Sequence, residues 1–254
     1  MCNVFSAPTG FDLTNISACI RRIQIQNFYG CVRHEVCGTT HHSVQRIFET
    51  FHKDEAGRIN HSNKWRGYLR GKTMPGLNTL TKVKEITGVD FNPELHQVLW
   101  VAMDVTVPLG NRTKALLKTL DEEIRDLALL IYAKLHRKNE RIDYDSFGWC
   151  HSLGEKAGLQ ALAAMTLLLR EANELGTTNA TWQMPWFLFQ MLLVLGPELQ
   201  QRGIAYLVYP FYLEHILPLY SGYEIDESAY GAHVNGSESA RLHGGKLGHG
   251  ETPV

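Results

Sequence analysis

Apolar residues recur every three or four positions along most of the chain, a spacing typical of one buried face of an α-helix. The spacing first appears in residues 14–27, which carry Ile16, Ile20 and Ile23. It returns in a segment that we expect to run from Ser43 to Gly57, with Val44, Ile47, Phe48 and Phe51 on one face. No segment has the convincing alternation of apolar and polar residues that marks a half-buried strand. These patterns predict an all-α fold.

The same spacing continues through the second half of the chain. Further helices are expected over residues 92–104, 111–139, 155–176, 185–196 and 204–220. Asn92 is expected to cap the first of these, with Pro93 in its first turn, and Gly176 to end the third. Residues 143–154 are expected to interrupt the helical pattern, and Gly196–Pro197 to separate the last two helices.

Charge divides the chain into a basic and an acidic half. Residues 1–120 hold 15 Lys and Arg against 9 Asp and Glu (15 − 9 = +6), whereas residues 121–254 hold 10 against 17 (10 − 17 = −7). We therefore expect a basic helical part over residues 1–110 and an acidic, apolar helical part over residues 111–223. The remaining residues, 224–254, are rich in Gly, Ser, His and charge, and are expected to be disordered. A basic half favours contact with a polyanion such as nucleic acid.

The most apolar segments do not predict a membrane protein. Residues 185–196 are too few to span a bilayer, which needs about 20 mostly apolar residues. Residues 204–220 contain Glu214, His215 and two prolines, so both segments are interpreted as buried core helices. The chain begins without a secretory signal pattern, and its five cysteines show no disulfide-like spacing. Reduced thiols and a cytoplasmic location are expected.

Residues 63–89, NKWRGYLRGKTMPGLNTLTKVKEITGV, combine an ordered apolar pattern with many cations. Ser62 can cap a helix whose buried face carries Trp65, Tyr68 and Leu69. Gly71 can take the left-handed conformation at its end, and Pro75 prevents its continuation. A second helix is expected to place Leu77, Leu80, Val83 and Ile86 along one stripe. The segment predicts two helices joined by a tight turn.

This segment resembles the second half of a lambda-repressor-like (Xre/Cro type) helix-turn-helix. The resemblance rests on an apolar pair three residues apart (Trp65 and Tyr68), a glycine at the helix end (Gly71), the turn GKTMP, and a following helix that starts with TL and ends with GV. It covers about 27 of 254 residues. It implies that residues 63–71 form a recognition helix, which in this family lies in the DNA major groove.

Cations concentrate around the same segment. Between residues 53 and 84 there are eight Lys and Arg against Asp54 and Glu55. Side chains at the start of a recognition helix meet base edges, and cations meet phosphates. The expected DNA-binding residues are Asn63, Lys64, Arg66, Arg70, Lys72 and Lys82. Two other interpretations remain open: a surface for a protein partner, and a solvated pair of scaffold helices.

The sequence gives less support to a metal site or a catalytic site. Cys31, His34, Cys37 and His41 are weak candidates for zinc ligands, because the C-x5-C spacing is not that of a usual zinc knuckle and no second pair follows at finger spacing. The chain has no H-E-x-x-H, G-x-S-x-G or P-loop pattern. Neither a metal, a cofactor nor an enzymatic reaction is therefore expected.

The sequence thus predicts a DNA-binding or regulatory protein with a helix-turn-helix-like basic part and an apolar helical bundle behind it. Lone helix-turn-helix units usually bind DNA as dimers, which favours a homodimer. The alternative is a non-enzymatic protein-interaction module, such as an inhibitor or a subunit of a larger complex, in which these helices are scaffold. In that case the acidic half faces the partner.

Overall fold

A computed structural model describes residues 12–49, 63–137, 144–156, 158–177 and 183–220. Every regular element among these residues is helical, which confirms the all-α class. All of them fall within one compact unit, Met1–Ser221. The predicted tail, residues 224–254, lies outside the described residues. No helix in the described ranges is long and apolar enough to cross a bilayer.

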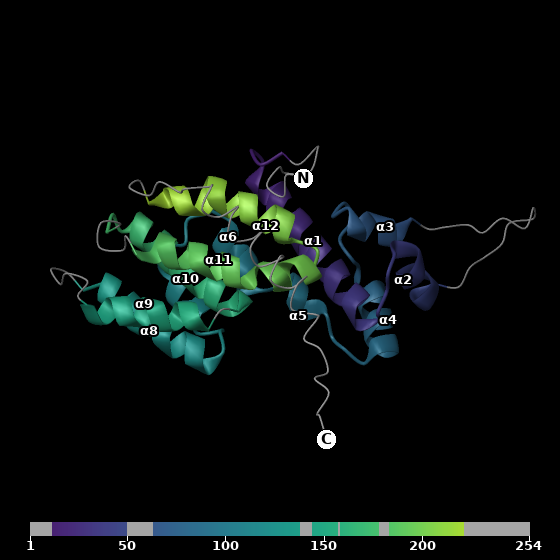
Figure 1. Ribbon diagram of the computed structural model, residues 1–254, viewed down its shortest axis with the longest axis horizontal. Coiled ribbons are helices and arrows are strands. Elements are labelled where there is room, and N and C mark those ends of the chain that lie inside the picture. Colours follow the sequence, from purple (N-terminus) through teal and green to yellow (C-terminus); the bar gives the residue numbers. More distant parts are fainter. Residues whose placement is uncertain (1–11, 50–62, 138–143, 157, 178–182, 221–254) are drawn as a thin grey trace, which may run out of the picture. The chain divides into compact units, whose positions relative to one another are not determined.

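The basic part begins with the long helix α1 (Ile16–Glu35), against which α3 (Lys64–Leu69) packs. Asn15 caps α1, because its side-chain oxygen accepts a hydrogen bond from the Ala18 N–H at 3.1 Å. The next helix, α2 (His41–Phe48), starts with a capping box in which Thr40 and Ser43 exchange hydrogen bonds. It contacts both α3 and α4 (Leu77–Thr87), so α2, α3 and α4 form a group beside α1 (Figure 1).

Short helices connect this group to the rest of the molecule. They are α5 (Asn92–Leu95), α6 (Val98–Met103), the 3-10 turn η1 (Gly110–Arg112) and α7 (Thr113–Leu117). The larger helices that follow are α8 (Glu122–Leu135), α9 (Tyr144–Glu155), α10 (Leu159–Glu174) and α11 (Gln183–Gln201). The chain then forms α12 (Ala205–Phe211), a π-helical turn (Tyr212–Ile216) and a 3-10 turn (Leu217–Leu219).

Helix α10 is the centre of the larger helical group, and its alanine- and leucine-rich sequence is buried on nearly all sides. It packs against α6, α8, α9 and α11 (Figure 1). As predicted, the helix stops near Gly176, which has φ +69° just beyond the cap residue Leu175. The two apolar segments expected to be core helices become α11 and α12, and most of their leucines are buried.

The predicted basic and acidic parts pack directly against each other across the boundary at residue 110. Arg170 of α10 is 3% exposed. Its Nη1 donates to the carbonyl oxygens of Val101 and Ala102 at 3.0 Å each, and its Nη2 donates to that of Val107 at 2.6 Å. Contacts between α1 and α12 also cross the boundary. The two parts therefore share one packed unit.

Several predicted helix limits are wrong in the first half. Helix α1 continues past residue 27 to Glu35 because Phe28, Tyr29 and Val32 extend its buried face. Helix α2 ends at Phe48, since Glu49 is extended; Phe51 and Gly57 lie outside the described residues, and Ile47 is 42% exposed.

The expected helix 92–104 divides at Gln97, and its cap residue is Phe91 rather than Asn92. One cause of the division is visible in the hydrogen bonding. The indole Nε1 of Trp100 donates to the carbonyl oxygen of Glu94 at 3.0 Å, and this carbonyl would otherwise serve the helix ladder.

Three further limits are corrected in the second half. The segment 111–139 breaks before α8, because the Asp121 N–H donates to the Gln160 side chain at 2.7 Å instead of to a helical carbonyl. Residues 144–155 form α9 where the sequence pattern predicts a break, because burial of Cys150 and Leu153 outweighs the glycines. Pro197 lies inside α11, where the buried Leu195 and Leu199 hold the helix on either side of the missing hydrogen bond.

Candidate nucleic-acid interface

The inner face of α3 is fixed by aromatic packing. Trp65 and Tyr68 are each 1% exposed. The Trp65 ring stacks on Phe48 of α2 with centroids 4.8 Å apart, and Tyr68 meets Phe28 of α1 edge to face at 5.9 Å. The Tyr68 hydroxyl lies 3.3 Å from the Thr79 hydroxyl, which links α3 to α4. The expected burial of Trp65 and Tyr68 is confirmed, and with it the orientation of α3.

The C-terminal end of α3 is a Schellman motif, which explains Gly71. The Lys72 N–H donates to the Gly67 carbonyl and the Gly71 N–H to the Tyr68 carbonyl, both at 2.9 Å. Gly71 has φ +65°, and a Cβ there would lie 2.4 Å from Arg22 Cγ and 2.9 Å from the Arg22 carbonyl oxygen of α1. Glycine is required by both the backbone conformation and this close approach. The turn therefore sets where α3 ends against α1.

The outer face of α3 carries the cations expected to bind DNA. Arg66, Arg70, Lys72 and Lys82 are exposed, as is Asn63, whereas Lys64 is half-buried. Among the described residues, none of the first four forms an ion pair. The neighbouring Lys84 does pair with Asp90 at 3.0 Å. The four cations are thus available to an external anion.

The N-terminal end of α3 differs from the expectation. The cap residue is Asn63, with φ +53° and no side-chain hydrogen bond to the helix, whereas Ser62 lies outside the described residues. Helix α2 ends at Phe48 and α3 begins at Lys64, and residues 50–62 between them are not described. The resemblance of residues 63–89 to the second half of a helix-turn-helix therefore stays a prediction.

Part of the predicted apolar stripe faces solvent. Val83 is buried and Leu80 is partly buried, but Leu69, Leu77 and Ile86 are 37%, 78% and 46% exposed. The inner face of α4 is instead made by Thr79 and Val83, four residues apart. A helix of only six residues, α3, covers too little of the group to bury Leu69 as well. The surface around α3 and α4 is therefore both basic and apolar.

The four weak zinc candidates do not gather at one point. Among the described residues, no three His, Cys, Asp or Glu side chains are placed to hold a metal. The Cys31 thiol contacts Arg202 Nη1 at 3.2 Å, and its burial raises its pKa to about 12. His34 contacts Gln201 Nε2 at 2.8 Å, Cys37 is exposed, and His41 packs on His42 with ring centroids 4.0 Å apart. Cys31 and His34 thus each contact the segment at the end of α11.

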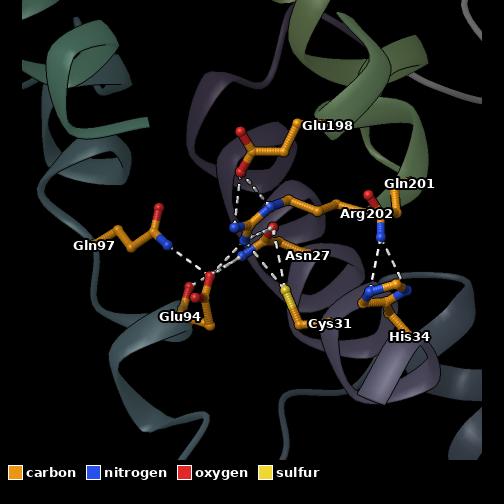
Figure 2. A network of polar contacts seen from close by, with 8 residues as sticks. All are labelled: Asn27, Cys31, His34, Glu94, Gln97, Glu198, Gln201 and Arg202. Carbon is orange, nitrogen blue, oxygen red and sulfur yellow. Dashed lines mark hydrogen bonds and ion pairs between the residues drawn. The ribbon is translucent and has the colours of Figure 1, made fainter. Parts of the chain in front are cut away.

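A polar network that the sequence analysis missed joins α1, α5 and α11 (Figure 2). Arg202 Nη1 donates to Glu94 Oε2 at 2.8 Å and to Asn27 Oδ1 at 3.3 Å, and Nε donates to Glu198 Oε1 at 2.9 Å. Glu94 Oε2 also accepts hydrogen bonds from the side-chain amides of Asn27 and Gln97 at 3.0 and 2.6 Å. One sequence signal points to Arg202, which is the single Lys or Arg between residues 171 and 240.

Comparison of the chain with protein-family models, with curated proteins and with solved structures found no match.

Proposed function

We propose that this protein binds duplex DNA through the outer face of α3 and the adjoining turn. The observation that supports the proposal best is a set of exposed cations that form no ion pair with any described residue: Arg66, Arg70, Lys72 and Lys82. They surround a helix whose other face is buried in the core. Residues 63–90 carry six Lys and Arg against Glu85 and Asp90 (6 − 2 = +4). A rigid helix with a cationic outer face is suited to a groove lined by phosphates.

The roles of the individual residues follow from their chemistry. Arg66 lies on the exposed side of α3, where its planar guanidinium can bind two acceptors of a guanine edge or one phosphate. Arg70 and Lys72 stand at the end of the helix and are placed to contact phosphates, as is Lys82 on α4. Asn63 and Lys64, at the start of α3, complete the proposed surface.

Assembly and location belong to the same proposal. A six-residue helix gives a small contact with DNA, so two copies acting on two half-sites would supply the affinity of a specific site. The four described cysteines are free thiols, which agrees with a reducing compartment such as the cytoplasm.

A protein partner is the second candidate, and the exposed apolar residues favour it. Leu77 is 78% exposed at the start of α4, and Ile86 and Val89 are 46% and 37% exposed near its end. Apolar side chains that remain exposed in this way are typical of a surface that another protein covers. In that case Arg66 and Arg70 would surround a protein contact.

A salt titration distinguishes the two candidates. Binding of the full chain to a fluorescent random duplex should weaken steeply as salt is raised, with a slope in log–log form of roughly −0.9 per phosphate neutralised. Four phosphate contacts would thus give a slope of about −3.6. Absence of binding at low salt, or a flat salt dependence, contradicts the DNA proposal and leaves the protein-partner candidate.

A further inference from the structure

A pocket of about 580 Å³ lies beside the Arg202 network and has no part in the proposed DNA surface. Its walls come from α5, α6, α8, α10 and α11 and from the turn before α8. Part of the lining is apolar and includes Leu120, Ile124 and Leu159. The polar wall consists of Glu94, Glu198 and Arg202. The volume is within the usual range for a small organic ligand, roughly 300–1,000 Å³.

The polar wall offers hydrogen-bond acceptors that the described residues do not use. Arg202 bonds to Glu94 through Oε2 and to Glu198 through Oε1, and Asn27 and Gln97 also use Glu94 Oε2. These hydrogen bonds leave Glu94 Oε1 and Glu198 Oε2 without a donor, although the Cys31 thiol also interacts with the Glu94 carboxyl group. In addition, the side-chain oxygen Gln97 Oε1 is buried without a donor. The polar wall therefore favours a ligand that donates hydrogen bonds over one that accepts them.

The charge of the lining points in the same direction. Glu94, Asp121 and Glu198 are three carboxylates, and Arg202 is the single Lys or Arg among the lining residues (1 − 3 = −2, with His96 neutral). Glu94 and Glu198 are also only partly exposed, with side-chain accessibilities of 25% and 40%. Carboxylates in such partly shielded positions attract a cation more strongly than fully solvated ones do.

We propose that this pocket binds a small organic molecule with a primary ammonium group and an apolar body. The ammonium, which has three N–H donors, would bond to Glu94 Oε1 and Glu198 Oε2, and the apolar body would cover Leu120, Ile124 and Leu159. A ligand with a carboxylate in place of the ammonium is disfavoured, since it would bring a fourth negative charge without supplying donors. The site is independent of the DNA proposal.

Two probes with the same phenylethyl body and opposite charge test the assignment. Isothermal titration calorimetry of the full chain at pH 7 would compare 2-phenylethylamine with 3-phenylpropanoate. Saturable binding of the amine is expected, about tenfold or more tighter than that of the acid, because each tenfold corresponds to about 1.4 kcal/mol, within the reach of one charge-assisted contact. Equal affinities for both probes, or no saturable binding of the amine, overturn the proposal.

Three variants locate the binding. Glu198→Gln should lose most of the amine affinity, whereas Glu85→Gln on the exposed part of α4, away from the pocket, should keep it. Thr119 lies at the exposed edge of the pocket, so Thr119→Phe should block the amine without touching Arg202. Amine binding that survives Thr119→Phe overturns the site. If Glu198→Gln melts early and its titration fails, the comparison of Thr119→Phe with Glu85→Gln decides the question.

Discussion

Phe28 of α1 meets Tyr68 of α3 edge to face, with ring centroids 5.9 Å apart and planes at 90°. The contact joins two segments that lie 40 residues apart (68 − 28) in the sequence. The ring centroids of Tyr68 and Trp65 are 5.4 Å apart, and the Tyr68 hydroxyl is hydrogen-bonded to the Thr79 hydroxyl. Tyr68 therefore connects α3 to both α1 and α4. The proposed DNA surface is thus joined to a packed support formed by α1 and α4.

The first prediction concerns that support. Trp65→Ala removes a side chain that is 1% exposed and stacked on Phe48, so the free energy of unfolding should fall by about 3–5 kcal/mol. The matched control is Trp186→Ala, because Trp186 is 45% exposed and should lose much less, about 1 kcal/mol or below. Urea unfolding followed by circular dichroism measures both, and similar losses would contradict the assignment of Trp65 to the core.

The turn after α3 gives a second prediction. Gly71→Ala and Gly88→Ala both place a Cβ on a residue of positive φ, which costs about 1–2 kcal/mol each. Only at Gly71 does the new Cβ also meet Arg22, whereas nothing lies within 4 Å at Gly88. Gly71→Ala should thus lose at least about 1 kcal/mol more than Gly88→Ala. Equal losses of stability in the two variants, measured by thermal or urea unfolding, would show that α1 is not in close contact with this turn.

A third prediction tests the packing of α1 on α11. A Cβ on Gly30 would lie 1.8 Å from the Arg202 carbonyl oxygen, so Gly30→Ala forces the two helices apart. A loss of about 1–3 kcal/mol is expected from this overpacking. Gly148→Ala in α9 is the control, since nothing lies within 4 Å there and alanine favours a helix by about 0.5–1 kcal/mol. A Gly30→Ala variant as stable as the control would mean that this contact is absent in solution.

Much of the fold could be predicted from the sequence because helical spacing is a local signal. The buried pair Trp65 and Tyr68 and the stop at Gly176 follow from residues close together in the chain. The break at Gln97 could not be predicted in this way, because it depends on how Trp100 and Glu94 meet in the folded chain. The path of α9 likewise depends on burial against other helices.

The two candidate sites also differ in how far they could be predicted from local sequence. The cations around α3 are visible as a local concentration of charge, and their exposure was predictable from the helical spacing of Trp65 and Tyr68. The Arg202 network was not, because Arg202 and Glu94 are 108 residues apart and no short motif links them. The burial of Leu69 and Leu77 is predicted wrongly, because apolar spacing alone does not tell which face of a short helix meets its neighbours.

The cysteines provide a fourth prediction. Burial raises the pKa of Cys31 and of Cys150 to about 12, whereas Cys37 is exposed. At pH 8 a maleimide should therefore label Cys37 in the folded protein and leave Cys31 and Cys150 largely unmodified, as peptide mass spectrometry can measure. Labelling in urea is the control, where all three should react. Equal labelling of Cys31 and Cys37 in the folded protein would contradict the part-buried Cys31–Arg202 contact.

The raised pKa of Cys31 also predicts how the free energy of unfolding depends on pH. An unfolded thiol has a pKa of about 8.5, so above that pH the unfolded chain loses the proton of Cys31 while the folded chain keeps it until about pH 12. The contribution of this thiol to stability is thus complete below about pH 8.5 and falls as the pH rises towards 12. Cys31→Ser should flatten that decline in urea unfolding measured from pH 7 to 10, and an unchanged decline would assign it to other groups.

The double variant Arg66→Ala/Arg70→Ala tests the central claim most directly. Both arginines are exposed, and neither has an ion pair among the described residues, so each replacement should change the free energy of unfolding by no more than about 0.5 kcal/mol. The control is Lys114→Ala/Lys118→Ala, which removes two exposed cations from α7 and its end, outside the proposed surface.

Binding of both variants to the same fluorescent duplex, measured with their unfolding curves at one low salt concentration, gives the decisive comparison. We expect Arg66→Ala/Arg70→Ala to keep its unfolding curve and to bind the duplex much more weakly than the unaltered chain does. Lys114→Ala/Lys118→Ala should bind nearly as the unaltered chain does. Equal weakening of DNA binding in both variants, or no weakening in either, would contradict an interface on α3.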